Sequence, residues 1–274
     1  MALKDRTAFG MSLPHRSPDT IDMPAVRQVA QRADALGFRD LWVTENTLDH
    51  VFCFDPMVIL TYAAAVTTQI RLGVGLGRDH HYAQFQTPRE RRVRRIREGV
   101  ELIKALWTEP RVNYQGSIFQ LDGGTMAPKP IQKPHPPIWL GGGHPDAIRR
   151  AATIADGWMG SGGSSTAEFS RSVPALRAAL EKVSRDPATF PISKRVFLSV
   201  HDRPDVARAE LDRWFTTVYH NPNGADASGV HGTPEQVRKR LQQLVAMGAN
   251  HLLLNPVCRH VEQLEALAAI VGLS

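Results

Sequence analysis

The chain has 274 residues, of which 42% are hydrophobic and 22% are charged, and its formal net charge is +6. This length and composition predict a globular protein, and βα barrels of about 250 residues often form a single domain. The N-terminus has no apolar run, and no stretch approaches the roughly 20 apolar residues that cross a bilayer, so we expect neither export nor a membrane span.

Short apolar, β-branched runs alternate with helical patterns along the chain, which is typical of βα units and a parallel sheet. The helices have recognisable ends. Asp22 begins one helix and Gly37 ends it, while Thr233 caps another that ends at Gly248. We expect strands in seven segments: residues 7–13, 39–44, 69–75, 137–141, 156–160, 194–200 and 250–255.

Three further segments fall outside this alternation. Residues 89–97 hold six arginines, which predict a helix whose basic face is either solvated or in contact with an anion. Base-stacking aromatics are not interleaved with these arginines, so we do not expect nucleic-acid binding. We expect one βα-barrel domain over 1–274, with a hairpin and proline-rich excursion at 110–137 and a polar loop at 220–232.

The segment RLGVGLGRDHHYAQF, residues 71–85, places three glycines at alternate positions before two adjacent histidines. It is no dinucleotide fingerprint, because Arg78 or His80 stands where the last glycine of G-x-G-x-x-G is needed. His80 and His81 would point to opposite sides of an extended chain, which makes a poor metal pair. We therefore expect no metal site.

Two glycine groups follow neighbouring predicted strands. The predicted strand at 137–141 runs into three glycines and then a helix. The next predicted strand, at 156–160, is followed by Ser-Gly-Gly. Glycines let a ligand approach the backbone, and the free N–H groups of a helix N-terminus attract phosphate. Because ligands of βα barrels lie at the carboxyl ends of the strands, these groups predict a phosphate site, the alternative being two tight turns. The residues are Gly141, Gly142, Gly143, Ser161, Gly162 and Gly163.

The run PPIWLGGGHPDAIRRAATIADGW, after a hairpin and a proline-rich linker, resembles the bacterial-luciferase-like superfamily of flavin- and deazaflavin-dependent oxidoreductases. ALGFRDLWVTEN resembles the family's second strand, DPMVILTYAAAVTTQIRLG its second helix and third strand, and GTPEQVRKRLQQLVAMGANHLLLNP its last helix and strand. This resemblance, which covers most of the chain, implies an α/β fold of the TIM-type (β/α)8 barrel class. It also implies FMN or coenzyme F420 at the carboxyl rim, with phosphate near the fifth and sixth strands.

The resemblance further implies a shortened barrel. GVGLGRDHHY resembles the end of the family's fourth strand, while IRLGV resembles the start of its third, so residues 73–77 correspond to both. Most of the third strand, its helix and the start of the fourth strand are then absent, in agreement with seven strands. In relatives that segment carries a bulge with a non-proline cis peptide that supports the flavin ring. Gly77 and His81 are the positions that would face the cofactor.

The second predicted strand ends in Thr-Glu-Asn, and an aspartate and a histidine, Asp49 and His50, follow it. Glu45 could orient a ring or act as a base if burial raises its pKa, or it could be a solvated rim residue. Many relatives have a proton-transferring histidine in place of Asn46, and asparagine can only hydrogen-bond. His50, four residues on, could substitute or lie in a surface loop. These three residues are the catalytic candidates.

Together these features predict an F420- or FMN-dependent oxidoreductase that acts on a small organic substrate by hydride transfer or oxygen activation. F420 is favoured, because the arginine cluster could meet its acidic glutamate tail. The alternative is an impaired barrel that only binds a phosphate-bearing ligand. Relatives that oxidise sugar phosphates have a glutamate where Arg78 stands, which argues against that substrate. A lyase or isomerase would need a lysine at a strand end, and the predicted ends offer none.

The two cysteines lie far apart without metal-type spacing, which favours buried thiols in a reducing cytoplasm. We therefore expect a cytoplasmic protein. The family resemblance suggests a homodimer.

Overall fold

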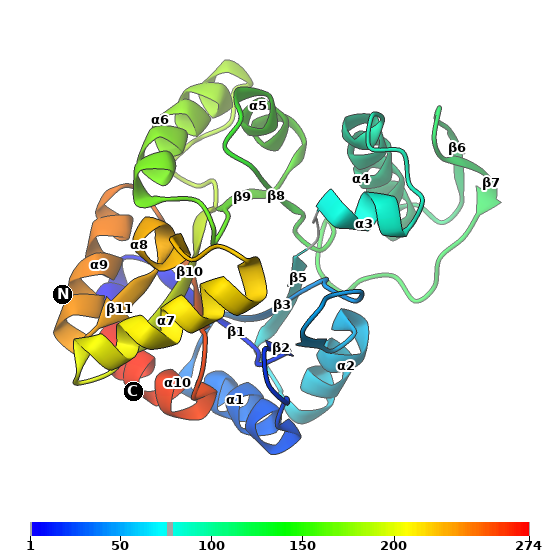
Figure 1. Cartoon of the computed structure of the whole chain (residues 1–274). Helices are drawn as coiled ribbons and strands as arrows, with labels where there is room; N and C mark the ends of the chain where they lie inside the picture. The colour runs from blue at the N-terminus through cyan, green and yellow to red at the C-terminus, as the bar shows by residue number, and fades with distance from the viewer. Residues whose placement is uncertain (1, 76–78, 274) are drawn as a thin grey trace.

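The computed structural model describes residues 2–75 and 79–273, and its centre is a strongly curled parallel sheet that forms a half-barrel (Figure 1). All seven predicted strands are present. The strands of the sheet are β1 (Ala8–Ser12), β3 (Asp40–Thr44), β5 (Arg71–Gly75), β8 (Trp139–Gly141), β9 (Gly157–Gly160), β10 (Ile192–Val200), β11 (Val230–Gly232) and β12 (His251–Pro256).

The strand order is β5-β3-β1-β12-β10-β9-β8, with β11 paired to β10, and every pairing is parallel. The chain therefore winds as a βα barrel does, but β5 and β8 form the two ends of the order. Within the described residues no strand joins these two edges, so the barrel is open where a further strand would close it.

Helices cover the outer face of the sheet, where they bury its apolar side chains (Figure 1). They are α1 (Met23–Leu36), α2 (Pro56–Val66), α5 (Pro145–Ile154), α6 (Thr166–Lys182), α7 (Pro204–Tyr219), α9 (Pro234–Ala246) and α10 (His260–Val271). Among the described residues, no helix is both long and apolar enough to span a membrane.

The predicted helix ends are confirmed at α1 and α9. The Asp22 carboxylate accepts the N–H of Ala25 at 3.3 Å, and Gly37 ends α1 with a φ of +80°, a conformation that glycine adopts without a Cβ clash. Thr233 begins α9 with a reciprocal pair of hydrogen bonds to Gln236, which satisfies two otherwise unpaired N–H groups.

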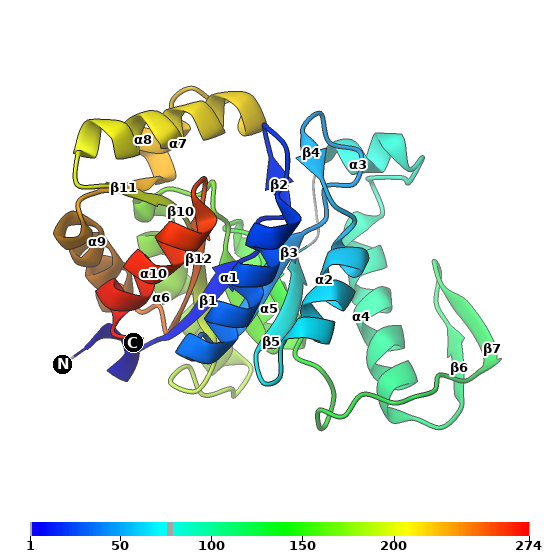
Figure 2. The same cartoon turned by 90° about the horizontal axis from the view of Figure 1, so that it is seen from below.

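A second unit lies to one side of the sheet in both views (Figures 1 and 2). It contains α3 (Asp79–Gln84), the basic helix α4 (Arg92–Thr108) and the predicted hairpin, formed by β6 (Val112–Gln115) and β7 (Gln120–Gly124). The prediction of an extended chain at His80 and His81 is wrong, because both residues belong to α3.

The segment 220–232 also differs from the predicted polar loop. It holds the short helix α8 (Gly224–Ser228) and the strand β11. Ala225 and Val230 are 2% and 5% exposed, so the segment contributes apolar side chains to the core. Three smaller elements complete the fold: a 3-10 turn at Leu3–Asp5 and the paired strands β2 (Arg16–Ser17) and β4 (Phe52–Cys53).

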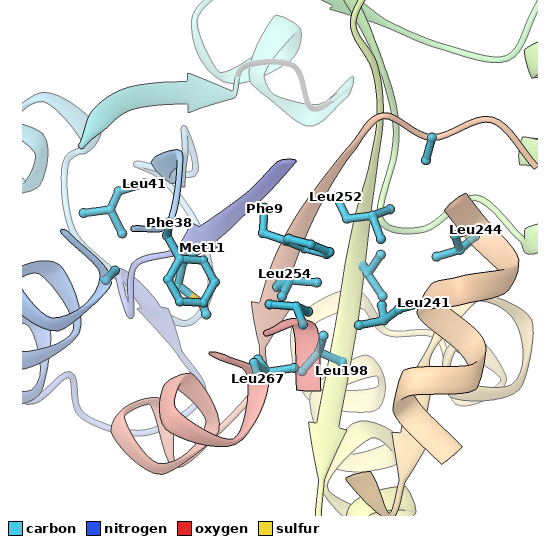
Figure 3. Close-up of a cluster of buried hydrophobic side chains, with 14 of the residues drawn as sticks. Phe9, Met11, Phe38, Leu41, Leu198, Leu241, Leu244, Leu252, Leu254 and Leu267 are labelled. Atoms are coloured by element: carbon cyan, nitrogen blue, oxygen red, sulfur yellow. The ribbon is translucent and has the colours of Figure 1, made fainter. Parts of the chain in front are cut away.

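The main core lies between the sheet and its helices (Figure 3). Phe9 of β1 and Leu252 and Leu254 of β12 are almost fully buried and point toward Leu241 of α9 and Leu267 of α10. Alternate residues of the same strands face the inside of the half-barrel. The two sides of each strand are thus apolar toward the helices and more polar toward the interior.

The interior face holds a buried polar chain. The His251 ring links the Ser193 hydroxyl, 2.7 Å from Nδ1, to the Asp40 carboxylate, 3.1 Å from Nε2, and the Trp42 indole donates to the same carboxylate at 2.7 Å. Gly10 lies directly beside this chain, and a Cβ there would fall 2.0 Å from Asp40 Oδ1. Glycine at this position is therefore required by packing.

We predict that Gly10→Ala lowers the free energy of unfolding by about 1–3 kcal/mol, because the added methyl group must displace Asp40 from His251. Gly99→Ala is the matched control, since its Cβ would meet Phe119 at an ordinary 3.7 Å within α4. Helix propensity predicts that this control is more stable by about 0.5–1 kcal/mol. Urea denaturation measures both, and a Gly10→Ala protein as stable as the wild type would contradict the packing described.

Candidate cofactor site

The two glycine loops follow neighbouring strands, as expected from the sequence. Gly141 of β8 lies in register with Met159 of β9, so the loops leave the sheet side by side at its carboxyl edge. Gly142 has a φ of +104°, and its carbonyl accepts the indole N–H of Trp158 at 3.0 Å. This bond fixes the first loop to the strand that carries the second.

Both loops lead directly into helices. His144 begins α5, its ring Nδ1 accepting the N–H of Asp146 at 3.2 Å, and Ser165 begins α6 in a reciprocal pair with Glu168. Among the described residues, the backbone N–H groups of Gly143 and Gly163 have no hydrogen-bond acceptor. Two helix N-termini with unused N–H groups make this edge suited to an anion.

A buried lysine, which the sequence analysis did not select, supports the second loop. Lys194 of β10 is 3% exposed, and its ammonium donates to the Ser161 carbonyl and, at 2.8 Å, to the Ser164 carbonyl. In a trans peptide the next N–H points opposite to the carbonyl, so the N–H of Gly162 points away from the lysine. The lysine thus fixes the orientation of the loop.

Burial lowers the pKa of Lys194 to about 7, although the nearby Glu168 carboxylate partly offsets this effect. The side chain is therefore a positive charge beneath the second loop below about pH 7, and it loses this charge as the pH rises. Its position in the sheet explains why the strand ends alone did not reveal it. Lys194 stands early in its own strand, but it pairs with Gly160, the last residue of β9.

The glycines leave room beside the loops. A Cβ on Gly163 would meet no atom within 4 Å, whereas a Cβ on Gly162 would fall 2.4 Å from the Phe197 ring. Gly143 and Ser164 border one cavity of about 740 Å³, which continues between α5 and α6. The cavity lies beside the two loops, where α5 and α6 begin, and is large enough for a small ligand.

The end of β3 carries Glu45 and Asn46. The Glu45 carboxylate accepts the N–H of Thr47 at 2.6 Å, so it folds back onto its own loop. Asn46 is 2% exposed, and its amide nitrogen donates to the Thr44 hydroxyl at 2.6 Å. This position is therefore a fixed hydrogen-bonding group at the edge of the half-barrel.

A buried histidine holds the Asn46 network in place. His15 Nε2 accepts the N–H of Thr44 at 2.9 Å, so Nδ1 must carry the proton that it donates to the Leu13 carbonyl at 2.8 Å. Burial lowers the pKa of His15 to about 3, and the nearby arginines Arg195 and Arg16 act in the same direction. The ring is thus a neutral support at physiological pH.

His50 lies in a different environment. Its Nδ1 is 2.9 Å from Asp49 Oδ1, its Nε2 is 2.9 Å from the Thr217 carbonyl, and its ring stacks on His220 at 4.2 Å. Asp49 also pairs with Arg16, and both of these side chains are almost fully buried. With both nitrogens facing oxygen atoms, His50 joins its loop to the end of α7.

A cavity of about 280 Å³ connects this loop to α3, because His50 and His220 line it together with Gln84. His81 lies one turn earlier on α3, with its ring centre 5.9 Å from that of Phe85 in an edge-to-face arrangement. Gly77 and Arg78 lie outside the described residues. The structure thus brings the loop after β3 close to α3, while the glycine loops form a separate group after β8 and β9.

The arginine cluster faces the hairpin. Arg91 and Arg94 donate to Ser117, and Arg95 lies over the Phe119 ring at 5.6 Å. Glu98 accepts four hydrogen bonds from the same hairpin; burial raises its pKa, but these bonds outweigh burial and lower the pKa to about 2. These contacts join three of the six arginines to the hairpin, and the anion contact of the cluster stays a prediction.

The chain matches a known protein family over most of its length. The model of the luciferase-like monooxygenase family matches residues 7–77 and 71–228. The two matched stretches overlap at 71–77, the segment that the sequence analysis assigned to two strands at once. This overlap agrees with a barrel in which one strand replaces parts of two.

Individual relatives differ in cofactor. The FMNH2-dependent dimethylsulfone monooxygenase of Pseudomonas putida is 25% identical over 64% of this chain and 56% of its own length. The chain thus spans little more than half of that relative. An F420-dependent glucose-6-phosphate dehydrogenase of Segniliparus rotundus is 28% identical over 77% of this chain and 71% of its own.

A monooxygenase of Streptomyces bottropensis has a similar fold, with a TM-score of 0.80, 20% identity and 97% of each chain covered. The family match extends over far more than half of the chain, and the relatives are flavin- or F420-dependent oxidoreductases. The chain therefore belongs to the luciferase-like monooxygenase family.

Proposed function

We propose that the chain is an F420- or FMN-dependent oxidoreductase acting on a small organic substrate, and that the loops after β8 and β9 hold the phosphate of its cofactor. The observation that carries this proposal is that two helix N-termini begin side by side, with the buried Lys194 ammonium beneath the loop of the second. Unused N–H groups and a fixed positive charge stabilise a phosphate without any rearrangement of the loops.

The residues present suit such a cofactor. Gly163 leaves open space beside its Cα, and Gly143 and Ser164 border the same cavity. When bound, the isoalloxazine or deazaflavin ring supplies hydride transfer or, for FMN, oxygen activation. The chain's own part is to anchor the phosphate, orient the ring and exclude water.

At the end of β3, neutral groups position a ligand. Asn46 cannot exchange a proton at neutral pH, and its amide is fixed by Thr44, which in turn is held by neutral His15. In this proposal Asn46 orients the ring or the substrate by hydrogen bonding. Glu45 and His50 remain the candidates for proton transfer, and each would first have to leave the contacts described above.

Cofactor binding tests the proposal directly. Adding FMN or F420 to the purified protein should shift the visible absorption band and change the fluorescence of at least one of them, because a ring in a defined pocket loses contact with water. Saturable binding at micromolar concentration is the expected result. If the protein bound inorganic phosphate but neither ring, the impaired-barrel alternative would be correct instead.

A negative charge introduced into the second glycine loop should weaken the binding of the phosphate and leave the binding of the ring unchanged. We predict that Gly163→Asp weakens FMN binding about tenfold, because its carboxylate would lie in the open space beside the loop and repel the phosphate. Gly163→Asn, with the same shape and no charge, is the control. Riboflavin, which lacks the phosphate, should bind both variants equally well. An equal loss for riboflavin would show that the loop does not hold the phosphate.

The lysine beneath the loop predicts a pH dependence. Lys194 carries its charge below a pKa of about 7 and loses it as the pH rises, so it should favour phosphate binding at pH 6 more than at pH 8.5. The ratio of FMN affinities between wild type and Lys194→Met isolates this effect, because the ligand titrates identically in both. We expect this ratio to fall severalfold over that range. A ratio independent of pH would exclude the lysine as a charge partner.

A further inference from the structure

The cavity between α5 and α6 extends well beyond the glycine loops. It begins at Gly143 and Ser164 and reaches Thr153 on α5 and Lys182 on α6. Seventeen-residue α6 rises about 1.5 Å per residue, so the cavity follows the helices for roughly 20 Å or more. This length exceeds what a phosphate group needs and suits an extended chain.

The sides of the cavity are basic. Arg149, Arg171 and Lys182 line it, against one carboxylate, that of Glu168. Glu168 is already engaged by the N–H of Ser165, and Arg149 pairs with Asp146 at the surface. In the described part of the chain, neither Arg171 nor Lys182 forms an ion pair.

The spacing of the two α6 cations follows the helix. Eleven residues are close to three full turns, so Arg171 and Lys182 lie on one face, about 16 Å apart. Between them the same face carries Ala175, Ala178 and Ala179, which also line the cavity. Small side chains between two cations leave a shallow path along which an extended chain of about five residues would fit.

The floor of the cavity is apolar and rigid. Trp158 and Phe169 are each 1% exposed, and their rings stack at 5.8 Å. Trp158 is also the residue whose indole fixes the first glycine loop. The floor is therefore continuous with the predicted phosphate site.

We propose that this groove binds an extended polycarboxylate chain attached to the phosphate held by the glycine loops, which identifies the ligand as F420 with its oligoglutamate tail. This inference rests on the proposed function. Carboxylates along the tail complement Arg171 and Lys182, while the phosphate occupies the loops at the start of the groove. The groove offers cations directly beside the phosphate site, whereas three of the arginines at 89–97 contact the hairpin.

Tail length provides the test. The probes are F420 with one glutamate and F420 with five or six glutamates, which share ring and phosphate, and deazaflavin fluorescence reports their dissociation constants. We expect the long-tailed form to bind the wild type about three- to tenfold more tightly at low salt, the size of effect that exposed ion pairs produce. Raising the ionic strength should reduce this preference.

The double variant R171E/K182E should lose the preference for the long tail and keep the affinity for the one-glutamate form. R238E/K239E on α9 changes the net charge equally, at exposed positions outside the cavity, and should keep the wild-type preference. Equal binding of both forms by the wild type would overturn the inference and leave the proposed function standing. Binding of neither form would overturn both.

One further outcome would also contradict the inference. If sedimentation showed that R171E/K182E changes the oligomeric state, the groove would be an interface between copies of the chain.

Discussion

The fold depends on a parallel sheet that curls like a barrel but has seven strands in its main path where closure needs eight. Across the inside of the half-barrel, an indole ring of β3, the neighbour of edge strand β5, meets one of the other edge strand, β8. Trp42 and Trp139 meet inside the half-barrel with their ring centres 5.8 Å apart. Each ring lies flat against a glycine of the next strand, since a Cβ on Gly73 or Gly157 would fall within 3 Å of it.

This opening separates the site into two parts. The loops after β8 and β9 stay together because their strands remain paired, and Lys194 supports them from the next strand. The loop after β3 instead contacts α3 and the end of α7. The half proposed to bind phosphate therefore does not depend on the missing strand, whereas the half near the opening contains the short helix α3 and a buried Arg16–Asp49 pair.

Strands and helix ends could be predicted from the sequence, because both depend on residues close together in the chain. Apolar runs revealed seven of the eight strands of the main sheet, and Asp22, Gly37 and Thr233 marked true helix ends because capping involves residues close in the chain. Contacts between distant residues could not be predicted in the same way. Lys194 reaches the loop after β9 only because of strand register, and arginines beside α4 meet the hairpin because the hairpin turn donates hydrogen bonds to Glu98 of that helix. The polar composition of 220–232 concealed the apolar residues that bury α8 and β11.

The central claim is that the loops at Gly141–Gly143 and Ser161–Gly163 hold a cofactor phosphate above Lys194. A crystal structure of the protein with F420 or FMN tests it most directly. The account predicts the phosphate within hydrogen-bond distance of the N–H groups of Gly143 and Gly163, with the Lys194 ammonium still bound to the carbonyl groups of the second loop. A phosphate bound at the arginines of α4, with the two glycine loops empty, would contradict it.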